Sequence, residues 1–354
     1  MTGFIVFSSI HWYTILPEAG PAQARQEIQL ASGNYLITGG ASLIGSHIAD
    51  RLLADGAREV RLLDNYSLGT PASIAHLNDE SRVKRIRGDV TRLPDLLEAM
   101  RDVDGVFALA GYLTLPMAQD PLSGVSVNTL GMVNTLEACR FSSVRRVIFS
   151  SSVAVYGAPA RFPITEDSGY VSAGLQPPSL LYGASKLMGE ALCARYARSF
   201  GLEFNNLRFA SVYGERQHAR AVNAVFVAKI CDQVRRGEAP VIEGDGSEVH
   251  DYVYVTDVAR ACVLAMHSSA HDHALNVATG VDTTATQVAE TALRICGRRD
   301  LKPQYREDRR AVRSAAGTRL EFSREKAERE IGWVPQVSLE EGMRRLIEWQ
   351  KTQS

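Results

Sequence analysis

The sequence has few of the features that mark a membrane-bound, metal-binding or disulfide-stabilised protein. Its apolar stretch near the N-terminus, residues 4–16, contains His11, follows no basic residue and is too short to span a bilayer. The five cysteines lie far apart and form no Cys-x-x-Cys pair, which argues against a zinc or disulfide framework and for reduced thiols in a cytoplasmic protein. We therefore expect no membrane partner and no metal.

The chain also lacks an excess of charge of either sign. It has 39 Lys and Arg residues against 40 Asp and Glu residues, so its formal net charge at pH 7 is −1. A chain without an overall positive field has no general means of attracting a polyanion. We therefore expect no nucleic-acid partner.

The length of 354 residues is enough for a main domain with a smaller second lobe. Residues 1–33 are predicted to be an N-terminal extension of unknown role, for which a mistaken start codon, an artefact or an extra arm packed on the body stay open. Residues 34–212 are predicted to form the main domain. Residues 213–354 are predicted to form mainly the smaller lobe, with some segments that return to the main domain.

From Asn34 onward, short β-prone apolar runs alternate with stretches of helical periodicity. The predicted strands are residues 35–38, 60–64, 83–87, 105–109, 146–151 and 204–209. The predicted helices are residues 43–54, 93–100, 125–139 and 181–200, and a last amphipathic helix covers about 339–350. This alternation is typical of an α/β fold with a doubly wound parallel sheet and helices on both faces, the Rossmann-type architecture.

A glycine-rich turn stands between the first predicted strand and the first predicted helix. It reads Thr38-Gly39-Gly40-Ala41-Ser42-Leu43-Ile44-Gly45. Glycines in this context let the backbone approach a pyrophosphate, while the helix N–H groups point at the phosphates. Asp64, at the end of the second predicted strand, supplies a carboxylate for the two adenosine ribose hydroxyls. No Arg or Lys follows it in Asn65-Tyr66-Ser67 to accept a 2′-phosphate, so the pattern predicts NAD rather than NADP.

Tyr182 and Lys186 form the candidate catalytic pair. They stand four residues apart in Tyr182-Gly183-Ala184-Ser185-Lys186, so they lie on one face of the predicted helix. The ammonium group and a cationic nicotinamide ring both favour the phenolate, which lets a tyrosine with a reference pKa of about 10 exchange protons near neutral pH. Ser152 ends a strand at the carboxyl edge of the sheet, where open α/β sheets bind ligands, and it can hydrogen-bond the same substrate hydroxyl.

These motifs together resemble those of the extended short-chain dehydrogenase/reductases, in particular the NAD-dependent nucleotide-sugar epimerase/dehydratase family. The resemblance covers nearly all of residues 34–349. Further similar segments, in the same order, are Gly88-Asp89-Val90, Asn128-Thr129-Leu130-Gly131, Leu207-Arg208, Val212-Tyr213-Gly214, Gly244-Asp245-Gly246, Asp251-Tyr252-Val253-Tyr254-Val255 and Leu275-Asn276-Val277-Ala278-Thr279-Gly280.

The resemblance implies roles for individual residues. Ser152, Tyr182 and Lys186 would carry the chemistry, and Lys186 would also hold the nicotinamide ribose. The residues implied for cofactor binding are Gly39, Ser42, Leu43, Ile44, Gly45, Asp64, Asn65, Asp89, Val90, Leu109, Ala110, Asn128, Ser150, Tyr182 and Lys186. Those implied for the substrate are Ser152, Ser211, Arg216, His250 and Arg313. The resemblance also implies homodimers formed through the helices that flank the catalytic core.

Four positions depart from the pattern of the family. Ser42 replaces the middle glycine of the cofactor turn, and Ala108 replaces a histidine in the run after the fourth strand. Ser211 stands where an asparagine is common, and His250 stands where relatives carry an arginine that contacts the nucleotide diphosphate. An imidazole binds a diphosphate less firmly than a bidentate guanidinium does, so the nucleotide of the substrate stays open.

The predicted reaction is epimerisation at carbon 4 of a nucleotide-activated sugar, a UDP-hexose or UDP-hexuronic acid, through a transient 4-keto sugar. By the same resemblance, dehydratases carry an Asp-Glu pair after the catalytic hydroxyl residue, and decarboxylases carry a Glu at the second position. Here these positions are Val153 and Ala154, which move no proton. Two alternatives stay open: an NAD(H)-dependent keto-sugar reductase or alcohol dehydrogenase, and an NAD-binding regulator without catalysis.

Overall fold

Seven parallel strands form the main sheet of the protein. The computed structural model describes residues 33–217, 225–309 and 319–353. Across the sheet the strands are ordered β10-β6-β5-β4-β1-β2-β3. Their bounds are β1 (Asn34–Thr38), β2 (Glu59–Asp64), β3 (Val83–Arg87), β4 (Gly105–Ala108), β5 (Arg146–Ser152), β6 (Glu203–Phe209) and β10 (His273–Val277). All neighbouring strands are parallel, which confirms the doubly wound α/β fold.

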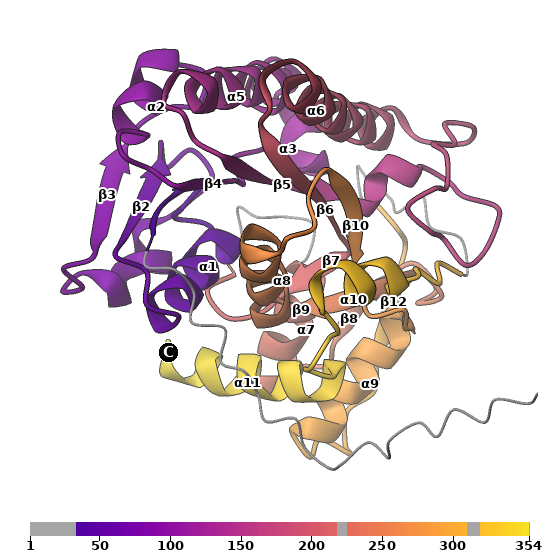
Figure 1. The fold of residues 1–354 in the computed structure, drawn as a ribbon. Coiled ribbons are helices and arrows are strands. Elements are labelled where there is room, and N and C mark those ends of the chain that lie inside the picture. The colour runs from indigo at the N-terminus through magenta and orange to yellow at the C-terminus, as the bar shows by residue number, and fades with distance from the viewer. Residues whose placement is uncertain (1–32, 218–224, 310–318, 354) are drawn as a thin grey trace, which may run out of the picture.

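Helices cover both faces of this sheet (Figure 1). On one face, α2 (Leu93–Ala99), α5 (Gly131–Phe141) and α6 (Pro177–Phe200) pack their apolar sides on the strands in one core. On the other face, α1 (Leu43–Ala54), α8 (Val255–His267) and α10 (Glu325–Ile331) build a second core. Because both faces are covered, β4 is buried at every one of its positions, as is typical of strands in parallel sheets.

Two helix boundaries differ from the sequence prediction. The helix predicted at 125–139 is part of a longer helical segment, made of α4 (Pro121–Val125), a π-helical turn (Ser126–Leu130) and α5. Asp120 caps α4 by accepting a hydrogen bond from Ser123 N at 3.1 Å. The helix predicted at 181–200 begins earlier, at Pro177, because proline fits the first turn of a helix, where its missing N–H costs no hydrogen bond.

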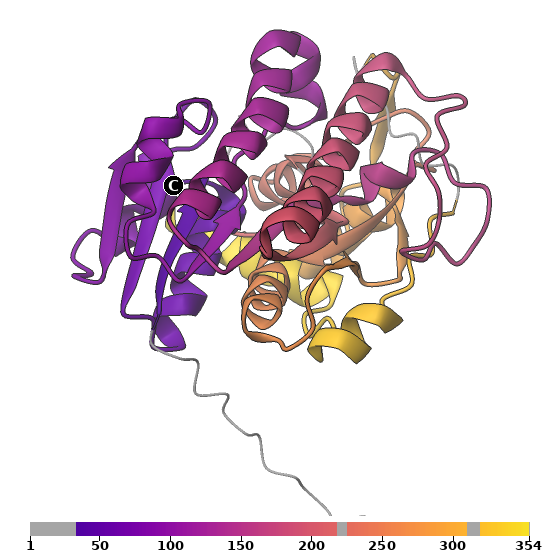
Figure 2. The ribbon, with the colours of Figure 1, turned by 45° about the horizontal axis from the view of Figure 1, so that its top comes forward.

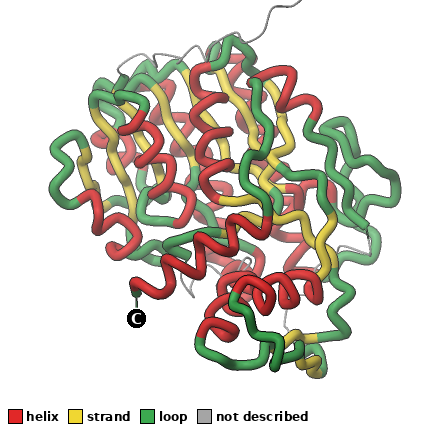
Figure 3. Tube along the Cα trace, turned by 90° about the horizontal axis from the view of Figure 1, so that it is seen from below, coloured by secondary structure: helices red, strands yellow, loops and turns green. Residues whose placement is uncertain are grey.

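The smaller lobe contains two short sheets. One is formed by β7 (Ser211–Tyr213), β9 (Val249–Tyr254) and β11 (Asp282–Thr284), and the other by β8 (Val241–Glu243) and β12 (Gln304–Arg306). Three helices complete its core: α7 (Val225–Arg235), α9 (Ala285–Ile295) and α11 (Leu339–Thr352), the last of which ends at the point marked C in Figure 3. After β9 the chain returns to the main sheet, where β10 pairs with β6.

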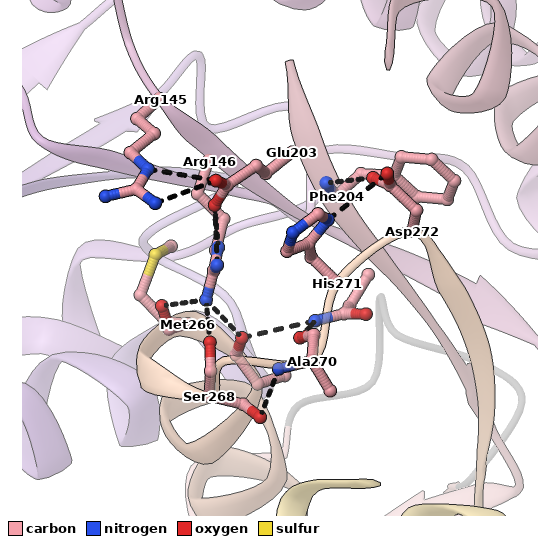
Figure 4. Close-up of polar contacts among 11 residues, drawn as sticks. Arg145, Arg146, Glu203, Phe204, Met266, Ser268, Ala270, His271 and Asp272 are labelled. Atoms are coloured by element: carbon pink, nitrogen blue, oxygen red, sulfur yellow. Dashed lines mark hydrogen bonds and ion pairs between the residues drawn. The ribbon is translucent and has the colours of Figure 1, made fainter. Parts of the chain in front are cut away.

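A buried arginine joins the main sheet to α8 (Figure 4). The Arg146 side chain on β5 donates to Glu203 Oε2 on β6, at 2.9 Å from Nε and 2.5 Å from Nη2. Its Nη1 also donates to the backbone oxygens of Met266, at 2.9 Å, and of Ser268 just beyond α8. Arg145 binds the other carboxylate oxygen of Glu203 from the surface. This ion pair lies at the amino end of β5 and β6, the end opposite to the ligand-binding edge of the sheet.

Neither a membrane segment nor a metal cluster is found among the described residues. No helix there combines the length and apolar character needed to cross a bilayer, and no group of His, Cys, Asp and Glu side chains could hold a metal ion. All five cysteines are free, and four of them are buried. The extension predicted at residues 1–33 lies outside the described residues except for Gly33.

Candidate active site

The loops after β1 and β4 meet at the point where the strand order of the main sheet reverses. Leu109 N donates to the Thr38 carbonyl oxygen at 3.2 Å, and Gly39 has a φ of 71°. A Cβ on Gly39 would lie 3.0 Å from Ala110 N, so a glycine is what lets the two loops come this close. Open α/β sheets bind their ligands in the crevice formed here.

The glycine-rich turn leads directly into α1. Gly45, in the first turn of the helix, packs on the backbone of the turn, because a Cβ there would lie 2.5 Å from Gly39 O. Ser42 is the N-cap of α1, and its Oγ accepts a hydrogen bond from Gly45 N at 3.1 Å. The serine that replaces the middle glycine therefore serves as a helix cap. The start of the helix, which includes Leu43 and Ile44, forms a cradle that fits a pyrophosphate.

Asp64 ends β2 beside this turn and is buried. Its Oδ2 accepts a hydrogen bond from Ala41 N at 3.0 Å, and its Oδ1 accepts one from Tyr66 N at 2.8 Å. Gly69 also lies against the carboxylate, since a Cβ there would be 2.7 Å from Oδ2. The geometry is compatible with a carboxylate that accepts hydrogen bonds from ribose hydroxyls.

A pocket extends from Asp64 to the loop after β4. The predicted cofactor residues that line it are Gly39, Ser42, Asp64, Asn65, Val90, Leu109 and Ala110. Asp89 is held beside them by a hydrogen bond of 2.9 Å from Asn65 Nδ2. The pocket also has lining residues that the sequence analysis missed, among them Ser67, Leu68, Gly69, Gly111 and Tyr112. They carry no motif of their own, because only the folding of the loops after β2 and β4 brings them to the pocket.

A second hollow is lined by Val90 and Ala110, which it shares with this pocket, and by Asn128 and Lys186. Asn128 lies in the π-helical turn between α4 and α5. Its Oδ1 accepts a hydrogen bond from Tyr112 N at 2.7 Å, and its Nδ2 donates to Ser185 Oγ at 3.0 Å. Asn128 therefore ties the loop after β4 to α6 and braces the wall of the site.

Lys186 is buried on α6 and reaches the carboxyl end of β5. Its Nζ donates to the Ser150 carbonyl oxygen at 2.8 Å, and Ser150 Oγ donates to Ala108 O at 3.0 Å. Burial lowers the pKa of Lys186 to about 8, while the carboxylate of Glu190 opposes this effect. Lys186 is therefore mostly charged at neutral pH and loses its charge above about pH 8.

Tyr182 and Ser152 are brought together beside Lys186. The Lys186 Nζ lies 5.9 Å from the centre of the Tyr182 ring. Burial raises the pKa of Tyr182 to about 12, and a hydrogen bond with Ser152 opposes the rise. Ser152 also caps the short 3₁₀ helix η3 (Val153–Tyr156) by accepting a hydrogen bond from Ala154 N at 3.2 Å. A phenolate at Tyr182 therefore needs further positive charge, such as that of an oxidised nicotinamide.

The predicted substrate residues other than Ser152, which lies beside Tyr182, fall into two separate places. Ser211 on β7 and His250 on β9 are in contact, with 3.2 Å between Oγ and Nδ1, and His250 Nε2 lies 2.8 Å from Glu248 Oε1. Arg216 instead donates to Asp50 Oδ2 on α1 at 2.6 Å. A direct contact between Arg216 and the substrate would require this ion pair to open. Arg313 lies outside the described residues.

Comparison with known proteins agrees with this geometry. Residues 35–278 match the sequence profile of the NAD-dependent epimerase/dehydratase family. The chain belongs to the NAD-dependent epimerase/dehydratase family. It is thus an NAD-dependent enzyme of the epimerase type.

Individual members of the family match over most of their length. A UDP-glucose 4-epimerase of Mycolicibacterium smegmatis is 32% identical over 323 residues, which are 90% of this chain and 99% of that protein. The solved structure of a UDP-glucose 4-epimerase with UDP-glucose from Thermotoga maritima has a TM-score of 0.80 and 31% identity, and the match covers 91% of this chain and 100% of that chain. UDP-glucuronic acid decarboxylase 1 of Danio rerio is 28% identical over 319 residues, which are 89% of this chain and 72% of that protein. Similarity over the whole chain therefore includes enzymes named for different reactions. The residues of the site have to indicate which reaction this chain supports.

In this member of the epimerase/dehydratase family, a buried ion pair lies between α6 and the main sheet. Glu190 on α6 and Arg208 on β6 form it, and the sequence analysis assigned neither of them a role. The spacing of four residues between Lys186 and Glu190 was a usable signal, because it puts both side chains on one helix face. The pairing with Arg208 carries no signal in the sequence, since strand β6 supplies it.

Proposed function

We propose that this family member interconverts the 4-epimers of a nucleotide-activated sugar, such as a UDP-hexose or a UDP-hexuronic acid. One observation carries the proposal: Ser152, Tyr182 and Lys186 are assembled at one edge of the sheet, whereas residues 153 and 154 have no ionisable side chain. Relatives that bind UDP-sugars support the substrate class. In this proposal residues 34–212 hold NAD, and residues 213–354 supply most of the sugar site.

The chain's own residues would act as follows. Tyr182 accepts the proton of the 4-hydroxyl group, and Ser152 hydrogen-bonds the same oxygen. NAD, when bound, supplies the acceptor and then the donor of one hydride. The Lys186 ammonium reduces the cost of a buried Tyr182 phenolate. Return of the proton from Tyr182 to the sugar oxygen restores an alcohol, so a turn of the keto sugar between the two steps gives the 4-epimer without net oxidation.

The residues after Ser152 favour this outcome over elimination or decarboxylation. Loss of water from carbons 5 and 6 needs an added base and an added acid close to the sugar. Val153 and Ala154 offer a branched hydrocarbon and a methyl group there, on the short helix that Ser152 caps. The 4-keto sugar then has one route onward, which is to recover its hydride. Ser211 and His250 would contact the nucleotide diphosphate from β7 and β9.

The test is a product analysis by proton NMR. The protein is incubated with UDP-glucose, UDP-galactose or UDP-glucuronic acid and catalytic amounts of NAD. We expect 4-epimers in each productive mixture. A 4-keto-6-deoxy sugar, or a UDP-pentose formed from UDP-glucuronic acid by loss of carbon dioxide, would overturn the proposal. Conversion of the added NAD to NADH without a 4-epimer would also overturn it, because that result would indicate a dehydrogenase. The Tyr182→Phe variant in the same mixture controls for a contaminating epimerase.

We further propose that the protein forms a homodimer through α6 and the helical segment that ends in α5, which lie side by side on the outside of the sheet (Figure 2). The exposed large apolar residues of these helices are Leu122, Val125, Leu130, Phe141, Leu180, Met188 and Phe200. Clustered exposed apolar side chains favour association, and a face made of two helices can pair with its own copy about a two-fold axis. Sedimentation should therefore give a dimer, and Met188→Glu should give a monomer. Val281→Glu, at an exposed apolar residue outside this face, is the control that should stay dimeric.

A further inference from the structure

An ion pair joins β6 to α6 directly behind the catalytic residues. Arg208 on β6 donates to both carboxylate oxygens of Glu190 on α6, at 2.9 Å from Nε and 2.7 Å from Nη2. The two side chains are only 10% and 11% exposed. Glu190 also accepts a hydrogen bond of 2.5 Å from Ser151 Oγ on β5. The carboxylate is thereby fixed to the residue that immediately precedes Ser152.

The same carboxylate stands one helical turn beyond Lys186. The spacing of four residues places both side chains on one face of α6. The other neighbours of the ammonium are neutral: the Ser150 carbonyl oxygen at 2.8 Å, the Phe149 ring at 5.1 Å and the protonated Tyr182 ring at 5.9 Å. The loop after β4 and the π-helical turn also present neutral groups to it. Among the described residues, Glu190 is the charged side chain that raises the pKa of Lys186 against the effect of burial.

Arg208 is in turn held where its charge counteracts that of Glu190. Its Nη1 donates to Tyr156 Oη at 3.0 Å and to the Glu166 carbonyl oxygen at 2.9 Å. Tyr156 Oη in turn donates a hydrogen bond to Asn276 Oδ1 at 2.5 Å. These contacts hold the guanidinium against Glu190. We therefore expect the effect of Glu190 on Lys186 to depend on the positive charge of Arg208 beside it.

We propose that Glu190 and Arg208 are positioning residues that set how strongly the buried Lys186 is held as an ammonium ion. The inference rests on the proposed function in one respect: the proposed function places Lys186 at the reacting centre. Glu190 stabilises the ammonium, and Arg208 limits that stabilisation. Neither residue lines the pocket that extends from Asp64 or the hollow that contains Lys186.

The two residues predict opposite effects, which a merely structural ion pair would not produce. Glu190→Gln leaves Arg208 unneutralised near Lys186, so the lysine should lose its proton at lower pH. Arg208→Gln leaves Glu190 unneutralised, so the lysine should keep its proton to higher pH. Both variants break the same ion pair and remove the same strand-to-helix contact. Arg208→Gln also affects the contacts with Tyr156 and Glu166, and Glu190→Gln also affects the one with Ser151, but neither loss accounts for pKa shifts of opposite sign at Lys186.

The experiment measures NADH affinity by fluorescence titration between pH 6 and pH 10, because a charged Lys186 is the proposed donor to the nicotinamide ribose. The wild-type affinity should fall with a midpoint near pH 8. The midpoint should be lower by about one pH unit in Glu190→Gln and higher by about one in Arg208→Gln. The double variant should lie between the two. The alkaline limb of kcat for UDP-glucose epimerisation should move in the same directions.

Glu203→Gln is the matched control, because it breaks the ion pair at the opposite end of β5 and β6 and should leave the midpoint unchanged. Shifts of the same sign in Glu190→Gln and Arg208→Gln, or no shift in either, would overturn the inference, as would a wild-type affinity without an alkaline midpoint. If Glu190→Gln does not fold, Arg208→Gln is compared with the double variant, whose midpoint must be the lower. If no nucleotide sugar is converted, the proposed function fails, while the NADH titration still decides the role of the pair.

Discussion

Replacement of Gly45 by alanine tests the cofactor turn at its tightest point. A Cβ on residue 45 would lie 2.5 Å from Gly39 O and 2.9 Å from Gly40 Cα. Favourable separations between non-bonded heavy atoms are about 3.5–4.0 Å, so α1 has to move away from the turn by on the order of 1 Å. Both neighbours are backbone atoms, which cannot rotate aside as a side chain can. Overpacking of this kind costs about 1–3 kcal/mol of stability.

The same displacement should weaken cofactor binding. It moves the start of α1, with its N–H groups and the Ser42 cap, away from the place that a pyrophosphate would occupy. We expect the dissociation constant of NADH in Gly45→Ala to rise about 10-fold to 100-fold, which corresponds to about 1.4–2.8 kcal/mol. Fluorescence titration measures the affinity, and urea unfolding measures the stability of the same samples.

Gly169→Ala provides the matched control for this substitution. A Cβ on Gly169 meets no atom within 4 Å. The control should therefore keep both its NADH affinity and its stability. If Gly45→Ala is folded and binds NADH as the wild type does, the turn before α1 is not the pyrophosphate cradle, and the assignment of the cofactor site is wrong.

Three further substitutions test other parts of the reasoning. Tyr182→Phe should lower turnover by a factor on the order of 10² or more while NAD binding persists, and full activity would place the proton transfer elsewhere. Asp64→Ala should weaken NAD binding about tenfold or more, since hydrogen bonds to a charged group contribute about 1.5–3 kcal/mol. Calorimetry should also show a smaller difference in affinity between NAD and NADP in this variant than in the wild type. Equal affinities of the wild type for the two cofactors would contradict the ribose assignment. Arg146→Met should reduce the free energy of unfolding, measured in urea, by about 2–4 kcal/mol, because it removes one partner of a buried ion pair. The other partner, Glu203, is still neutralised by Arg145. A loss below about 1 kcal/mol would refute this reasoning.

The sequence was sufficient to predict the elements that build the cofactor site, because their signals are local. The helix predicted at 43–54 has the same bounds as α1, since Ser42 caps its start and its apolar spacing is regular. The strand before it was predicted within one residue, as β1 begins at Asn34. Asp64 was found by its position at a strand end, and the parallel pairing of β1 with β2 brings it to the glycine turn.

Contacts between distant segments could not be predicted in this way. Arg216 was predicted to bind the substrate from the family resemblance, yet its ion-pair partner is Asp50 on α1, 166 residues away. A single sequence contains no record of such pairs, because either residue alone is an ordinary surface charge. Arg208 is a similar case: it lies in a segment that resembles the family, but its place beside α6 depends on the pairing of β5 with β6. The pocket residues Ser67 to Gly69 depend likewise on how one loop folds against Asp64.

Ser211 and His250 are separate departures from the family's pattern in the sequence, but they act as one unit in the structure. They lie on the neighbouring strands β7 and β9 with 3.2 Å between Oγ and Nδ1, and Glu248 holds the other ring nitrogen at 2.8 Å. An asparagine and an arginine in these places would offer an amide and a fixed positive charge, whereas this pair offers a hydroxyl and an imidazole that is already bonded on both nitrogens. A change at one position alone would leave the other without its matched partner, and residues in contact contribute non-additively. We therefore expect any effect of these two positions on nucleotide preference to come from the pair and not from either residue alone.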